Sequence, residues 1–77
     1  MTIRIEYMGF FKIDGVPSGT PVSVEPDTTI ENLLDRMLVK KESRTYMVPL
    51  VNRTRKPFNH ILQDNDSLFL YFPVGGG

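Results

Sequence analysis

The chain has 77 residues, which corresponds to one small domain near the lower limit for a single hydrophobic core. It contains no cysteine, so a disulfide, a thiol nucleophile and a thiolate metal ligand are all excluded, while 40% apolar residues suffice for a compact core. Nine basic and nine acidic residues cancel, which argues against a nucleic-acid partner held by bulk charge.

The apolar pattern of the chain gives no sign of a targeting or membrane segment. The first six residues, Met-Thr-Ile-Arg-Ile-Glu, alternate in polarity and do not form the apolar block of a signal peptide. The longest apolar run, Leu68 to Val74, is far shorter than the roughly 20 residues that span a bilayer. We therefore expect a cytoplasmic protein with no membrane partner.

The first part of the chain shows two strand patterns separated by a long connection. Residues 2–8 alternate between apolar and polar, which predicts a half-buried strand. Residues 9–19 contain three glycines and a proline and predict a connection whose apolar residues, among them Ile13, enter the core. A second strand is expected at residues 22–25, and Pro26 ends it.

One helix is expected in the middle of the chain. Thr28 and Glu31 match a capping box, in which the two side chains bond to unpaired N–H groups of the first turn. The apolar residues that follow recur on one helical face, at Ile30, Leu33, Leu34, Met37 and Leu38. Lys40 and Lys41 come next, where the helix dipole favours positive charge. The pattern predicts a helix of about three turns.

The second half of the chain returns to strand patterns. Residues 46–51 predict a strand, although Pro49 indicates an edge position or a bulge. Residues 52–56 form a polar turn region with room for a short strand, residues 64–66 a turn, and residues 67–72 the last strand. This order of elements predicts an α+β fold in which one amphipathic helix covers one face of a sheet.

The C-terminal sequence resembles a known family. Leu62 to Asp66 reads Leu-Gln-Asp-Asn-Asp, and an apolar strand and the ending Phe-Pro-Val-Gly-Gly-Gly follow it. This pattern resembles the sulfur-carrier family that includes MoaD, the small subunit of molybdopterin synthase, and ThiS, the thiazole-forming sulfur carrier. The approach to the tail and the long first connection resemble MoaD more than ThiS. The resemblance implies a ubiquitin-like β-grasp fold over residues 1–74, with a mixed four- to five-stranded sheet packed on one main helix, and a flexible glycine tail at residues 75–77.

Three positions depart from the family pattern. Asn65 stands where the acidic turn usually has glycine, and asparagine is the non-glycine residue that best tolerates a left-handed backbone, so we expect the turn to be kept. Asn52 and Arg53 replace a usual Asn-Gly, so we expect that connection to be wider or differently shaped. Gly75 replaces the alanine or serine common in MoaD, which leaves the pathway open between the molybdopterin and thiamine types.

The resemblance implies chemistry at the terminal carboxylate of Gly77. In the family, an adenylating enzyme of the ubiquitin-activating type joins this carboxylate to the α-phosphate of ATP. A sulfur donor then displaces AMP, and the resulting thiocarboxylate donates sulfur within a synthase, either a large molybdopterin synthase subunit or a thiazole synthase. Gly75 and Gly76 would pass through a narrow channel because they lack Cβ atoms. The chain itself is then a protein co-substrate without a bound cofactor, and not an enzyme.

Partners must also bind the folded body, because ordering three glycines costs roughly 3–6 kcal/mol and the tail offers little apolar surface. We expect partners to bind the sheet face away from the helix, with Phe69 and Tyr71 as exposed aromatic anchors beside the tail. The other residues expected to contact partners border this face or follow the last strand: Met47, Arg53, Arg55, Pro73 and Val74.

Two other functions use the same sequence features. A ubiquitin-like modifier would need the same activated Gly77 but would transfer it to lysines of other proteins. A plain interaction module would leave the tail idle. A metal site is not expected, because the residues after Asp64 and Asp66 are apolar where a calcium loop requires further oxygen ligands.

Overall fold

The computed structural model describes residues 1–8 and 11–73. Its elements, in chain order, are β1 (Thr2–Tyr7), β2 (Thr20–Ser23), α1 (Ile30–Arg36), the 3₁₀ helix η1 (Lys41–Arg44), β3 (Val48–Val51), β4 (Thr54–Arg55) and β5 (Ser67–Tyr71). The predicted α+β class is confirmed, and the short strand expected within residues 52–56 is present as β4. The boundary expected between residues 74 and 75 lies outside the described residues.

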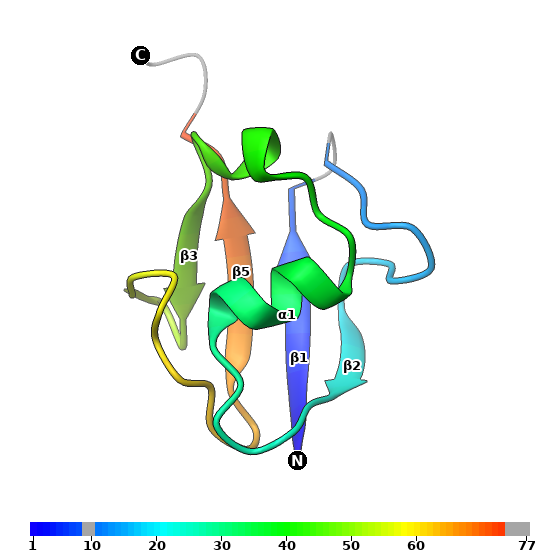
Figure 1. Ribbon diagram of the computed structural model, residues 1–77, viewed down its shortest axis with the longest axis vertical. Helices are drawn as coiled ribbons and strands as arrows, with labels where there is room; N and C mark the ends of the chain where they lie inside the picture. The colour runs from blue at the N-terminus through cyan, green and yellow to red at the C-terminus, as the bar shows by residue number, and fades with distance from the viewer. Residues whose placement is uncertain (9–10, 74–77) are drawn as a thin grey trace.

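The strands form one mixed five-stranded sheet in the order β2-β1-β5-β3-β4. The two central strands, β1 and β5, run parallel, and the remaining neighbours pair antiparallel. Helix α1 crosses one face of this sheet and leaves the other face uncovered by any helix of the described part (Figure 1). The last strand therefore lies in the middle of the sheet and is hydrogen-bonded on both sides.

The core lies between α1 and the sheet. Ile30, Leu33 and Leu34 of the helix have no exposed surface, as the amphipathic pattern predicts. Leu68 and Leu70 of β5 are equally buried beneath them. Other buried apolar residues come from every strand but the edge strands and from the connections: Ile3, Ile5, Ile13, Val24, Val39, Met47, Val51, Leu62 and Phe72. Burial of Ile13 confirms that the β1–β2 connection enters the core.

The helix begins one residue later than the predicted capping box places it. Thr29 is the N-cap, and its side-chain oxygen accepts a hydrogen bond from the N–H of Asn32 at 3.0 Å. Thr28 donates its hydroxyl to the carbonyl of Glu25 instead, so it belongs to the preceding turn. Two adjacent threonines offer equivalent capping oxygens, and Thr29, whose backbone also forms a bridge with Ile61, is the one that starts the helix.

The helix also ends earlier than predicted, after seven residues. Leu38 has a φ of 61°, so it turns the chain away from the helix, and its side chain is 87% exposed. The expectation that Leu38 continues the buried helical face is therefore wrong, because the helical spacing no longer applies once the backbone becomes left-handed. Lys40 and Lys41 lie beyond the helix end, and Lys41 opens η1.

No helix of residues 1–8 and 11–73 has the length and apolar character needed to cross a membrane.

Candidate functional site

The uncovered face of the sheet carries the aromatic side chains of β5. Leu68 and Leu70 face the helix and are fully buried, whereas Phe69 is half-buried and Tyr71 is 40% exposed on the other side. The two aromatic rings lie 6.3 Å apart at an angle of 37°. The predicted orientation of this strand is confirmed. That Phe69 and Tyr71 bind a partner stays a prediction.

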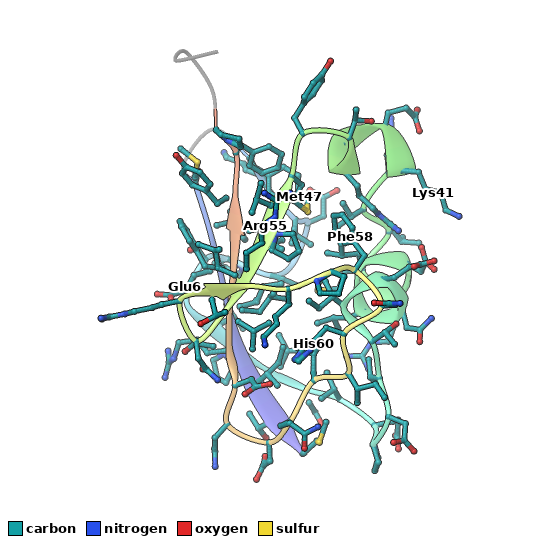
Figure 2. All side chains as sticks on the ribbon, turned by 90° about the vertical axis from the view of Figure 1, so that its left-hand side faces the viewer. Glu6, Lys41, Met47, Arg55, Phe58 and His60 are labelled. Carbon is teal, nitrogen blue, oxygen red and sulfur yellow. The ribbon has the colours of Figure 1, made fainter. Side chains whose placement is uncertain are left out.

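The strand register arranges a row of side chains across this face. Phe69 lies opposite Glu6 of β1 on one side and Leu50 of β3 on the other, and Leu50 in turn lies opposite Arg55 of β4. Figure 2 shows Glu6 on the opposite side of the sheet from Phe58, which belongs to the helix side. The row thus has an apolar middle with an acidic residue at one end, and Arg55 on the edge strand β4 also lines a pocket with Met47 and Pro49.

A shallow depression follows the same row. It is lined by Glu6, Tyr7, Ser18, Leu50, Asn52, Arg53, Ser67 and Phe69. The carboxylate of Glu6 on β1 and the guanidinium of Arg53, which follows β3, border it, and neither belongs to an ion pair within the described part of the chain. Such a surface suits a protein partner with an apolar centre and charged groups of both signs at its rim.

The prediction that Met47 belongs to this face is wrong. Met47 is 4% exposed and packs in the core, and Figure 2 shows it on the helix side of the sheet. Strand β3 pairs with β5 so that Val48 lies opposite Tyr71, which places Val48 and Leu50 on the uncovered face and Met47 and Pro49 on the core face. Sequence reasoning missed Val48 and Leu50 because both alternating sets of this strand are apolar.

The connection between β3 and β4 is not wider than an Asn-Gly turn, contrary to expectation. Val51 pairs with Thr54, so Asn52 and Arg53 are the two residues of a tight hairpin turn. Both have positive φ, 51° and 72°, as the favoured two-residue hairpin turns require. Arg53 accepts a backbone strain that glycine would avoid. The turn thereby holds the guanidinium of Arg53, which is exposed, at the rim of the depression.

The acidic turn before β5 uses its carboxylates to hold the chain. Asp66 is 7% exposed, and its two oxygens accept hydrogen bonds from the side-chain amide of Asn52 at 2.9 Å and from the N–H of Gln63 at 2.8 Å. Asp64 accepts from the N–H of Thr2. Asn65 has a φ of 70°, as expected for a residue that replaces glycine there. Within the described residues no group of three or more potential metal-ligating side chains is present.

The folded body is anchored where the C-terminal segment leaves it. Phe72 is 7% exposed, its ring lies 5.0 Å from that of Phe11, and its N–H donates to the sulfur of Met8 at 3.2 Å. Pro73, the next residue, is exposed. Tyr46, which is 76% exposed, lies in the turn that precedes β3.

The remaining predicted site residues lie at the C-terminal end. Val74, Gly75, Gly76 and Gly77 lie outside the described residues, and their roles stay predictions. The structure leads up to them: β5 ends at Tyr71, at the same end of the molecule as η1 (Figure 1).

Comparison with solved structures identifies the architecture. The structure of SAMP1 from Haloferax volcanii matches with a TM-score of 0.73 at 18% identity over the whole of both chains. A second structure of H. volcanii small archaeal modifier protein 1 matches with a TM-score of 0.73 at 15% identity, covering 95% of this chain and 98% of that one. A putative molybdopterin converting factor, subunit 1, from Pyrococcus furiosus matches with a TM-score of 0.69 at 16% identity over 95% and 98% of the two chains.

The chain has the ubiquitin-like β-grasp fold. No protein-family model and no curated protein matches its sequence. The expected resemblance to MoaD and ThiS is thus supported at the level of the fold, in which a mixed sheet holds one helix on one face. In this β-grasp the strand β5 contributes Phe69 and Tyr71 to the uncovered face, and Pro73 follows two residues after the strand ends.

Proposed function

We propose that this protein is a carrier whose reactive group is the terminal carboxylate of Gly77. The observation that supports the proposal most directly is the position of β5. A fully paired central strand ends at Tyr71, Phe72 is still packed in the core, and the sequence then continues with Pro73, one valine and three glycines. Four extended residues can reach up to about 14 Å, enough to enter a partner's buried active site while the body stays outside.

The proposed reaction has two steps in a partner enzyme that binds ATP. The carboxylate oxygen of Gly77 attacks the α-phosphate of ATP, which forms an acyl adenylate and releases pyrophosphate. A sulfur donor then attacks the acyl carbon and displaces AMP, and the product is a thiocarboxylate in which sulfur replaces one oxygen. The folded body binds and positions the substrate end, and it supplies no catalytic group of its own.

We further propose that the uncovered sheet face binds these partners. Its apolar centre at Phe69 and Leu50 adjoins the end of β5, so one partner can contact the face and receive the C-terminal segment. An interface of about 1,000 Å² or more is expected for a specific complex, and this exceeds what four small residues can bury. Tyr71, Pro73, Arg53 and Arg55 would contribute to its rim.

The molybdopterin pathway is our first choice for the sulfur product. One of the structures similar to this chain is that of a putative molybdopterin converting factor, subunit 1, and that similarity covers nearly all of both chains. A thiamine-type sulfur carrier remains the alternative within the same chemistry. The acceptor would then be a large molybdopterin synthase subunit or a thiazole synthase, and the site of action the cytoplasm.

A second candidate function is protein modification through Gly77. It is favoured by the similarity to two structures of a small archaeal modifier protein. The first step would be the same adenylation. A lysine amine of a target protein would then attack the activated acyl carbon instead of sulfide, forming an amide bond and releasing AMP.

Intact-protein mass spectrometry tests these proposals. The natural protein is first purified from its host to establish that Gly77 carries the free carboxylate. The chain is then incubated with the adenylating enzyme of its host, ATP and sulfide. We expect the mass to rise by the difference between a sulfur and an oxygen atom. A semisynthetic chain that ends in a carboxamide is the matched control, because its body is unchanged and its carboxylate is lost.

The same samples separate the two functions. Conversion of the natural chain to a thiocarboxylate, with no change in the amidated chain, supports the carrier. Conjugates of higher mass in host extract, absent with the amidated chain, support the modifier. If neither product forms with an enzyme that charges another carrier, the proposed chemistry at Gly77 is wrong.

A further inference from the structure

A second surface of the molecule carries a feature that the chemistry at Gly77 does not use. The connection between α1 and η1 and the β1–β2 connection lie side by side (Figure 1). A groove lies between them. The groove is lined by Phe11, Lys12, Ile13, Asp14, Met37, Leu38, Val39, Lys40 and Ser43. It shares no lining residue with the depression on the uncovered sheet face.

The helix end at this groove has the geometry of a Schellman motif. The N–H of Leu38 donates to the carbonyl of Asp35 at 3.1 Å, and the N–H of Val39 donates to the carbonyl of Leu34 at 3.0 Å. Val39 and Leu34 are both buried, which supplies the apolar contact that accompanies this motif. Leu38 therefore occupies the left-handed position that glycine, or sometimes asparagine, occupies in most such motifs.

Leucine at this position is unfavourable for the free protein in two ways. Its Cβ atom is strained at a φ of 61°, and its side chain is 87% exposed, so it gains almost nothing from burial. A strained residue persists when surrounding structure holds it, and it is a reason to look for function. Here Arg44 holds the connection, because its guanidinium bonds to the carbonyl of Val39 and pairs with Asp35 at 2.8 Å.

The groove beside Leu38 has an apolar floor and a basic rim. Ile13 and Val39 form part of the core, and Phe11 and Met37 are half-buried against it. Lys12 and Lys40 are both exposed, and the side-chain amine of neither makes a hydrogen bond or ion pair within residues 1–8 and 11–73. Asp14 also lines the groove, so its charged side chains are two basic ones and one acidic one.

We propose that this groove docks a short segment of another protein that presents an apolar side chain to Leu38 and Met37 and acidic side chains to Lys12 and Lys40. The two free amines argue for acidic groups on the occupant, because charge complementarity steers and orients association. Leu38 would be buried only in the complex, which explains an exposed and strained leucine where glycine would suit the isolated chain. The proposal does not depend on the chemistry at Gly77.

The variant Leu38→Gly separates docking from stability. It relieves the left-handed strain, and after the backbone entropy of glycine is subtracted we expect the folded-to-unfolded ratio to stay level or rise by about two- to fivefold. Loss of binding in such a variant cannot be ascribed to unfolding. Lys40→Glu reverses one charge at the rim, and Ile61→Thr is the matched control, because Ile61 is 44% exposed and lies outside the groove.

The test uses random short peptides displayed on phage and selected on the full-length protein, with removal of peptides that also bind Leu38→Gly. We expect enriched peptides that combine apolar and acidic residues. The affinity of a synthetic copy should fall at least about tenfold with Leu38→Gly and with Lys40→Glu and stay unchanged with Ile61→Thr. Its amide-shift footprint in NMR should centre on residues 37–40.

Several results would overturn the proposal. They are the enrichment of no peptide, the enrichment of basic peptides, a footprint on the uncovered sheet face, and a Leu38→Gly variant that unfolds more readily than the natural chain. Self-association of the natural chain that Leu38→Gly abolishes would also overturn it, because the occupant would then be a second copy.

Discussion

Asn52 joins the β3–β4 turn to the start of β5, and replacing it tests how the central strand is held. Its side-chain amide donates to the buried carboxylate of Asp66 at 2.9 Å, and its side-chain oxygen accepts from the N–H of Ser67 at 3.0 Å. Its backbone has a φ of 51°. Two substitutions separate these contributions, because glycine tolerates the left-handed backbone and alanine does not.

The magnitudes follow from the contacts. Asn52→Gly removes both side-chain hydrogen bonds, about 1 kcal/mol for the neutral one and about 1.5–2 kcal/mol for the one to the carboxylate of Asp66, so unfolding becomes easier by about 2–3 kcal/mol. Asn52→Ala loses the same bonds and adds about 1 kcal/mol of backbone strain. We therefore expect Asn52→Ala to be the less stable variant, at about 3–4 kcal/mol below the natural chain.

Urea unfolding followed by far-UV circular dichroism measures both variants, since the chain has no tryptophan to report by fluorescence. Equal slopes of the transitions would show that only the stability has changed. If Asn52→Ala is as stable as Asn52→Gly, the backbone is not strained at this turn. If both lie within about 0.5 kcal/mol of the natural chain, Asn52 does not hold β5.

Four further substitutions test other parts of the structure. Arg53→Gly should raise the free energy of unfolding by about 1 kcal/mol, seen as a higher urea midpoint, because glycine fits the second turn position; a lower midpoint would contradict this. Thr29→Ala should lower the free energy of unfolding by about 1 kcal/mol through loss of the cap, and by more than Thr28→Ala does. A larger loss with Thr28→Ala would mean that Thr28 is the N-cap, as the sequence predicts. Leu68→Ala should lower the free energy of unfolding by about 2–5 kcal/mol, and a loss below 1 kcal/mol would mean that Leu68 is not in the core. Phe69→Ser should reduce kcat/KM for adenylation at least about tenfold with a stability change near 1 kcal/mol or less, and unchanged kinetics would remove Phe69 from the partner surface.

The sequence predicts β5 well because its two faces differ in chemistry. Leu68 and Leu70 alternate with Phe69 and Tyr71, and the aliphatic set is the one that packs against a helix of leucine and isoleucine. At β3 the same reasoning gives the wrong orientation, because Met47 and its neighbour Val48 are both apolar. Periodicity alone then cannot tell which of the two alternating sets of side chains faces the core. Pairing with β5, which is a long-range contact, decides it.

The helix ends were predicted less well for a related reason. Thr28 and Thr29 are chemically equivalent caps, so the local pattern does not tell which of them starts the helix. At the other end, the spacing of apolar residues continues to Leu38, and no glycine marks the stop. The backbone leaves the helix there because Val39 is buried against the core and Arg44 binds its carbonyl, neither of which a local pattern contains.

For the carrier function that we propose, the placement of β5 would let one small domain bind partners and present its end to them. A partner that drew the C-terminal segment into its active site would pull along β5. That pull is resisted by the backbone bonds to β1 and β3 on either side, by Asp66 at the start of the strand and by the buried ring of Phe72 at its end. Because these contacts share the load as one unit, the body can remain folded while the residues after Pro73 enter another protein. An edge strand, bonded on one side only, would peel away more readily, which is a physical reason for a carrier to place its last strand at the centre of the sheet.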